Sequence, residues 1–167
     1  MVTSDAVLAV LQMINDPEMP ISIVDLGMVH AVRIADQPAG RVQVDILPTF
    51  VGCPALPVIE QEIRKRVGAL PGVAGLEVRF LFDPPWSVDR INERGRESLR
   101  QIGITVPLAV DADRSDAAPF CPFCGASAVH LESAFGPTRC RMIYYCESCR
   151  NSFEHMKRIH INPPRQP

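Results

Sequence analysis

Two Cys-x-x-Cys pairs near the end of the chain constrain its fold more than any other feature. They are Cys121/Cys124 and Cys146/Cys149. Two cysteines separated by two residues can turn both sulfurs toward one point, so each pair supplies half of a tetrahedral ligand set. A segment of roughly 40 residues buries too little apolar surface to fold unaided, so binding of the metal would also drive its folding. The spacing therefore predicts a zinc ribbon at residues 119–162.

The predicted metal is structural, because a set of four cysteine ligands leaves no coordination position open for water or substrate. Redox-active or incidental thiols are the alternative for these four residues. Cys140 lies between the two pairs and is either a small buried apolar residue or a free thiol near the metal. His155 and His160 are expected to be solvated surface histidines, with a role as spare ligands as the alternative.

Residues 1–106 have the pattern of a small α+β domain that mixes helices with three strands. Val42, Val44 and Ile46 alternate with polar residues, as expected for a half-buried strand. Turn residues precede this strand, which favours an antiparallel hairpin with the strand before it. The expected elements are helices at residues 3–15, within 54–69 and at 87–102, and strands at 28–35, 41–47 and 73–82.

Residues 107–118 are polar and aperiodic, so we expect a linker between the two domains, and residues 163–167 form a tail. The net charge is −2, which gives no general attraction to nucleic acid or to an anionic membrane. No secretory signal is visible, and no apolar run approaches the ~20 residues that span a bilayer. We therefore expect a cytoplasmic protein with reduced thiols.

Cys53 stands where the second strand gives way to the second helix. A thiol at a helix N-terminus faces unpaired N–H groups and the positive end of the dipole, which favours a reactive thiolate. An inert capping or core cysteine is the alternative, and Pro57 could delay the start of the helix. An acidic loop precedes the first strand, and its carboxylates would suit iron if the loop folded over Cys53. The loop contains Asp16, Glu18 and Asp25.

Several motifs resemble the metal–sulfur cluster assembly family that includes SufT-like proteins. They are the run from Asp16 to Val29 and the cysteine motif from Pro48 to Ala55. The segment from Asp83 to Arg96 is similar to the bacterial phenylacetate branch of that family. The zinc-type tail narrows the resemblance to the PaaD (PaaJ) family of phenylacetyl-CoA epoxidase accessory subunits.

The resemblance implies an iron–sulfur assembly fold for the first domain, with Cys53 contacting a transient iron or iron–sulfur cluster. Thr49, Glu18 and Asp25 would be its neighbours in the motif. It further implies an accessory subunit that assists maturation of the epoxidase in aerobic phenylacetate degradation and is not itself an enzyme. Its partners would be the other epoxidase subunits, and a homodimer is left open.

Two other functions compete with this interpretation. The chain could be a stable, non-catalytic subunit of the oxygenase complex. A nucleic-acid-binding ribbon is the second alternative, since the tail carries several arginines and lysines, but the slightly acidic balance and the lack of a second basic domain disfavour it. An independent enzyme is disfavoured as well, because no nucleophile triad order, phosphate loop or open metal site is present.

Overall fold

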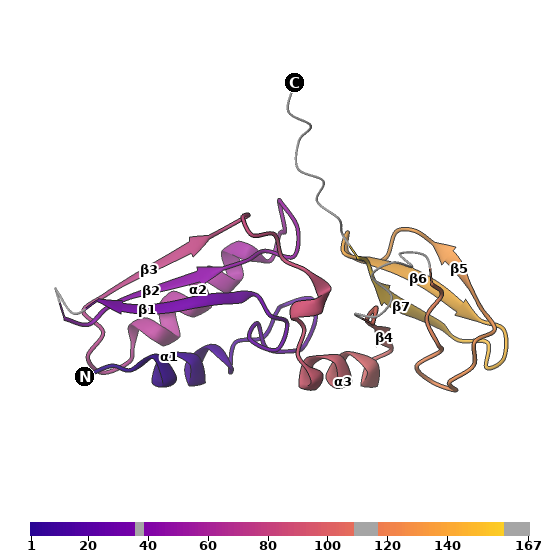
Figure 1. The fold of residues 1–167 in the computed structure, drawn as a ribbon, viewed down its shortest axis with the longest axis horizontal. Coiled ribbons are helices and arrows are strands. Elements are labelled where there is room, and N and C mark those ends of the chain that lie inside the picture. Colours follow the sequence, from indigo (N-terminus) through magenta and orange to yellow (C-terminus); the bar gives the residue numbers. More distant parts are fainter. Residues whose placement is uncertain (36–38, 109–116, 159–167) are drawn as a thin grey trace, which may run out of the picture. The chain divides into compact units, whose positions relative to one another are not determined.

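The computed structural model describes residues 1–35, 39–108 and 117–158. The chain forms two compact units, Met1–Trp86 and Ser87–Pro167, which run from indigo to magenta and from magenta to yellow in Figure 1. Within the described residues, no helix combines the length and the apolar character that a membrane crossing requires.

The first unit is built on a three-stranded sheet in the order β1-β2-β3. Strand β1 (Val29–Ala35) runs antiparallel to β2 (Arg41–Ile46), as expected for the hairpin. Of the turn expected at residues 36–40, residues 36–38 lie outside the described residues. Strand β3 (Gly75–Phe80) pairs in parallel with β2. A parallel pair needs a crossover connection, and helix α2 (Leu56–Gly68) supplies it. The unit is thus of the α+β class.

The core of this unit lies between the sheet and its helices. Val42 and Val44 of β2 are fully buried, and so are Ile63 and Val67, which lie four residues apart on α2. Helix α1 (Ser4–Leu11) packs against both α2 and β1. The apolar side chains on one face of the strand, which alternate with polar ones, and those on one face of the helix, which follow its 3.6-residue period, therefore pack together in one layer.

The opposite face of the sheet is polar and is organised around Asp45. The Asp45 side chain is fully buried although it points away from the apolar layer. Arg79, its neighbour on β3, donates from Nε to Oδ1 at 2.9 Å and from Nη2 to Oδ2 at 3.1 Å. Arg33 of β1 pairs with Oδ2, and Gln43 donates to Oδ1 at 3.0 Å. One carboxylate on the central strand thus joins all three strands.

Helix α1 ends at Leu11, four residues before the predicted end. The backbone beyond it pairs with a later segment: Ile23 N–H donates to Ile14 C=O at 2.9 Å, and Asp16 N–H donates to Ile21 C=O at 3.0 Å. These partners replace helical hydrogen bonds, so the helix stops before Pro17 restricts it. A contact between distant segments therefore overrides the local helix signal.

The second unit contains a four-stranded sheet in the order β4-β7-β6-β5. The first domain was expected to end at residue 106, whereas the second compact unit already begins at Ser87. The reason is that the short strand β4 pairs with β7 and helix α3 packs on β4. The elements are a 3₁₀ turn at Val88–Arg90, α3 (Glu93–Gln101), β4 (Ile104–Thr105), β5 (Val129–Ser133), β6 (Arg141–Cys146) and β7 (Ser152–Met156).

The predicted third helix is two separate elements. Ser87, the first residue of the predicted helix, accepts from Asp89 N–H at 3.3 Å and caps only the 3₁₀ turn. Asn92 caps α3 instead, through a 2.8 Å bond from Gly95 N–H to its Oδ1. The Asn92 side chain thus begins a new helix inside the predicted one, because it accepts a hydrogen bond from an N–H group of the first turn that would otherwise have no partner.

Candidate metal centre

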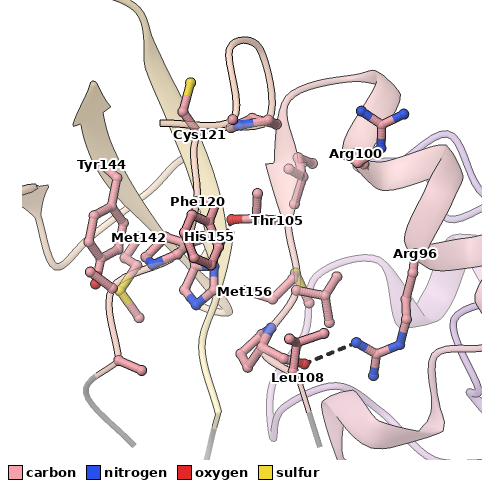
Figure 2. A pocket seen from close by; sticks show the side chains of 18 of the residues that line it. Arg96, Arg100, Thr105, Leu108, Phe120, Cys121, Met142, Tyr144, His155 and Met156 are labelled. Atoms are coloured by element: carbon pink, nitrogen blue, oxygen red, sulfur yellow. Dashed lines mark hydrogen bonds between the residues drawn. The ribbon is translucent and has the colours of Figure 1, made fainter. Parts of the chain in front are cut away.

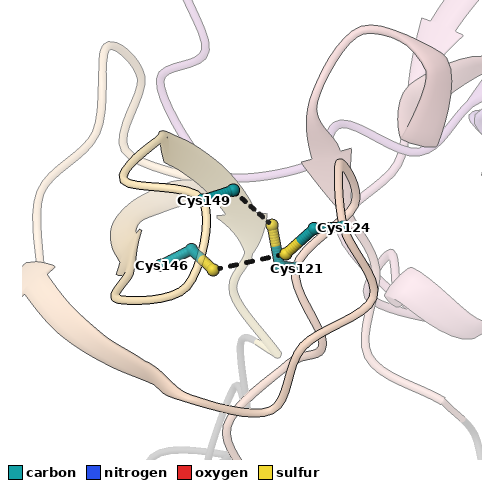
Figure 3. A group of neighbouring side chains, drawn as sticks. All are labelled: Cys121, Cys124, Cys146 and Cys149. Carbon is teal, nitrogen blue, oxygen red and sulfur yellow. Dashed lines mark hydrogen bonds between the residues drawn. The ribbon is translucent and has the colours of Figure 1, made fainter.

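The two Cys-x-x-Cys pairs meet at one point of the second unit. Their four Sγ atoms all lie within 4.8 Å of one another, and Figure 3 shows them converging from two loops. Cys121 Sγ is 3.6 Å from Cys149 Sγ, and Cys124 Sγ is 3.6 Å from Cys146 Sγ. A tetrahedron with Zn–S bonds of ~2.3 Å has sulfurs about 3.8 Å apart. The four sulfurs are therefore spaced to bind one metal ion in a tetrahedral arrangement.

Both loops use the same backbone turn. The N–H four residues after the first cysteine of each pair donates to that cysteine's C=O: Gly125 to Cys121 at 2.9 Å and Arg150 to Cys146 at 2.8 Å. Gly125 has φ +75° and Arg150 has φ 59°. A left-handed residue at this position folds the chain back so that both sulfurs point inward. Glycine is the residue type that favours such a conformation, whereas arginine is not, so the sequence indicates only the first of the two turns.

Hydrogen bonds from nearby groups act on individual sulfurs. Asn151 Nδ2 lies 3.5 Å from Cys149 Sγ, and the N–H donation from Asn151 lowers the pKa of the Cys149 thiol to about 6. At Cys124 the N–H of Ala126 also favours the thiolate, but desolvation and the adjacent sulfurs outweigh it and raise the pKa to about 12. Adjacent thiolates repel one another, so the four thiols resist losing their protons together. A bound divalent cation would neutralise this repulsion and favour the thiolates.

The apolar core of the ribbon coincides with its metal ligands. Cys121, Cys146 and Phe153 are each at most 3% exposed and form one cluster, against which Tyr144 and Val129 pack. Without a cation this cluster would rest on a few side chains, which is too little to hold three strands. Binding of a metal by these cysteines would therefore accompany formation of the sheet in this part of the chain.

The remaining tail candidates lie away from the four sulfurs. Cys140 is buried, its Sγ is 3.1 Å from Thr138 Oγ1, and it is not among the four clustered ligands. The expectation of a solvated His155 is wrong: it is 6% exposed, and its Nδ1 lies 2.7 Å from Thr105 Oγ1. Strand β4, which the sequence analysis did not detect, covers this histidine. His160 lies outside the described residues.

The structure corrects the expected setting of Cys53. It is only 7% exposed, whereas a thiol at the start of a helix was expected to be accessible. Helix α2 begins at Leu56 with Ala55 as its N-cap. Pro57 has no N–H to donate to the Cys53 carbonyl, so the helix starts later and the thiol lies before its first turn. The helix dipole is therefore a weaker argument for a thiolate than the sequence suggested.

The other predicted neighbours of Cys53 occupy different environments. Thr49 is buried like Cys53, and Glu18 is exposed. Asp25 is buried and accepts from Gln12 Nε2 at 2.8 Å. Among the residues that the structure describes, only the four tail cysteines gather as a group of three or more metal-ligating side chains. Cys53 and the two carboxylates therefore do not form a preassembled iron site.

The acidic loop is an ordered part of the first unit. Asp16 is buried, and its Oδ1 accepts from the N–H groups of Glu18 at 2.8 Å and Met19 at 3.0 Å. Trp86 is buried as well, and its Nε1 donates to Leu26 C=O at 2.9 Å. These contacts fix both ends of the loop, so its shape is set by packing and backbone bonds.

Comparison with known proteins covers both units. Residues 4–79 match the family described as "Iron-sulfur cluster assembly protein", and residues 106–157 match the "PaaD zinc beta ribbon domain". A component of the "Putative 1,2-phenylacetyl-CoA epoxidase" of Escherichia coli is 36% identical over 90% of either chain. The chain belongs to the PaaD family. It thus combines an assembly-type first unit with the ribbon of that family.

Relatives of the first unit alone are also found. The "Fe-S protein maturation auxiliary factor YitW" of Bacillus subtilis is 31% identical, over 56% of this chain and 89% of its own length. A crystal structure of a DUF59 domain from Bacillus anthracis has a TM-score of 0.53 and 28% identity, over 57% of this chain and 89% of that one. The fold class predicted for the first unit is confirmed.

Proposed function

We propose that this PaaD-family chain is an accessory protein that supports assembly of iron or iron–sulfur centres in a multicomponent phenylacetyl-CoA epoxidase. The observation that carries the proposal is the match over both units to a protein named as a component of that epoxidase. Similarity of the first unit to named maturation factors points to the same role. The protein acts in the cytoplasm, where thiols stay reduced.

The second unit would hold zinc through Cys121, Cys124, Cys146 and Cys149. A tetrathiolate zinc ion is closed to substrate, so it supplies folding energy and a rigid sheet rather than chemistry. In this proposal the ribbon presents a surface to partner subunits, and the first unit handles the metal cargo. The chain has no catalytic residue of its own.

Cys53 is the residue we assign to the cargo. It lies in the loop between β2 and α2, beside the exposed residues Val51 and Gly52. Gly52 has φ +82°, and apart from Gly52 and its two chain neighbours no heavy atom lies within 4 Å of where its Cβ would be, so the turn is open on that side. A buried thiol in such a loop is protected from oxidation until the loop shifts. Contact with a partner would make Cys53 available to iron.

The test is a coexpression of the epoxidase subunits with this chain or with its Cys53→Ser variant. We expect at least a ten-fold loss of epoxidase activity and of its iron content, because serine is a poor ligand for iron cargo. Cys140→Ser is the matched control, since Cys140 is also a buried thiol outside the zinc set. That control should retain both iron and activity.

Two results would count against the proposal. Full activity and normal iron content with Cys53→Ser would remove Cys53 from the function. Size-exclusion chromatography separates an assembly factor from a stable subunit, because an assembly factor is absent from the mature complex. Stoichiometric co-elution with an epoxidase that keeps its iron without this chain would favour a structural subunit.

A further inference from the structure

The second unit contains a cavity beside the metal loops. Its volume is about 850 Å³, within the range of binding pockets. Figure 2 shows Arg96 and Arg100 on one side and Met142, Tyr144 and His155 on the other. The Cys121 loop forms part of the wall. The apolar lining includes aromatic rings and thioethers, namely Phe120, Phe123, Tyr144, Met142 and Met156.

One buried side chain offers an unused hydrogen-bonding atom to this cavity. His155 is 94% buried and lines the cavity. Thr105 Oγ1 donates to Glu154 C=O at 3.3 Å and lies 2.7 Å from His155 Nδ1. The hydroxyl has one proton, so both bonds form together only when Nδ1 carries the ring proton. Nε2 is then an acceptor, and among the described residues it has no partner.

Of the five charged Arg and Glu side chains that line the cavity, all but the exposed Glu93 are already paired within the described residues. Arg158 pairs with Asp89 at 2.7 Å. Arg100 pairs with Glu97 at 2.8 Å. The Arg96 guanidinium donates to three backbone carbonyl groups. Burial also lowers the pKa of His155 to about 4, so the ring is neutral near pH 7. The cavity therefore favours an uncharged aromatic group that carries a hydrogen-bond donor over a carboxylate.

Three of the residues that line the cavity are large, apolar and exposed. Phe120, Leu108 and Phe123 line it and are 65%, 56% and 54% exposed. Clusters of exposed large apolar side chains mark interaction sites. A small molecule inside the cavity would leave these three residues in water, whereas a polypeptide with one inserted side chain would cover them. Tyrosine and tryptophan are the residues that most often anchor such contacts.

We propose that this cavity receives a tyrosine or tryptophan side chain of a partner polypeptide, with its O–H or N–H donating to His155 Nε2 and the flanking chain covering Phe120, Leu108 and Phe123. The inference rests on the proposed function, because an accessory protein needs a docking site on its partner. It assigns that site to the second unit and not to the loop around Cys53.

The test measures binding to the zinc-loaded full chain and needs neither iron nor an epoxidase. The probes are the capped peptides acetyl-Ala-Ala-Tyr-Ala-Ala-amide and acetyl-Ala-Ala-Phe-Ala-Ala-amide, and free p-cresol. Methyl NMR signals of Met142 and Met156 report the cavity, and those of Met13 and Met28 in the first unit are the internal control. We expect the tyrosine peptide to bind about five-fold more tightly than the phenylalanine peptide, because one net hydrogen bond is gained.

Substitutions locate the two parts of the site. His155→Phe should abolish the preference for tyrosine. Thr105→Val, which removes the hydroxyl that fixes the tautomer of the ring, should weaken that preference and is the test if His155→Phe does not fold. Phe120→Ala should weaken both peptides, whereas Phe135→Ala should not, because Phe135 is exposed but does not line the cavity. Equal affinity of the two peptides, p-cresol binding as tightly as the tyrosine peptide, or no shift at either cavity methionine would each overturn the proposal. Activity loss in Cys53→Ser would be unaffected by any of these results.

Discussion

Replacing Asp45 with asparagine should remove a pH-dependent part of the stability of the first unit. The hydrogen bonds from Arg79, with those from Arg33 and Gln43, lower the pKa of Asp45 from 3.8 to about 2 against the opposing effect of burial. Each pKa unit corresponds to ~1.36 kcal/mol, so the charged form contributes about 2 kcal/mol to the free energy of unfolding. Because the folded pKa is lowered, this contribution is complete above pH 3.8 and is lost as the pH falls through about 2.

The assay is urea unfolding followed by the fluorescence of Trp86, the single tryptophan, which is buried in the first unit. This probe avoids confusion with acid release of metal from the cysteines of the second unit. The free energy difference between wild type and Asp45→Asn should be about 2 kcal/mol at pH 6 and fall toward zero near pH 2. Glu77→Gln, which removes an exposed carboxylate from the same sheet, should change stability little. An equal difference at both pH values would refute the argument.

Two further predictions concern the metal centre. Chelation of the metal should unfold β5, β6 and β7 and leave the fluorescence of Trp86 unchanged, because a structural zinc ion contributes ~10 kcal/mol or more to folding. Circular dichroism and NMR spectra measure the loss of the ribbon. A ribbon spectrum that persists after complete removal of the metal would contradict this prediction. Arg150→Gly should stabilise the ribbon by ~1 kcal/mol, because Arg150 adopts a left-handed φ of 59° that glycine adopts without strain. Gly125→Ala should destabilise the ribbon by a similar amount through backbone strain alone, because the added Cβ would meet no neighbouring atom. Thermal unfolding of the zinc-loaded variants measures both, and shifts in the same direction would show that backbone strain is not the cause.

The sequence predicts those parts of the structure that depend on the spacing of residues close together in the chain. The cysteine pairs predicted the ribbon, and alternation in β2 with the helical period of α2 predicted the core of the first unit. Strand β4 has only two residues and pairs with β7, which is about 50 positions later, so no local pattern reveals it. The burial of His155 and the assignment of α3 to the second unit follow from that pairing.

Other features depended on contacts that no spacing encodes. Helix α1 ends early because the backbone after it pairs with residues 21–23. Arg150 takes the left-handed position that Gly125 takes after the first cysteine pair, and because arginine does not favour this conformation, the sequence gives no sign of the second turn. Cys53 has the position of a reactive thiol in the chain but is buried in the fold. Burial of a single side chain depends on the loops around it, which sequence pattern does not place.

The overlap between the metal ligands and the ribbon's core has a consequence for the cell. If the ion is zinc, as proposed above, its loss would break the metal–sulfur bonds and expose Phe153 and its neighbours at the same time, so a zinc-starved chain would offer unfolded backbone to proteases. The amount of intact protein would then follow zinc supply even though its proposed cargo is iron. Scarcity of one metal could in this way limit delivery of the other.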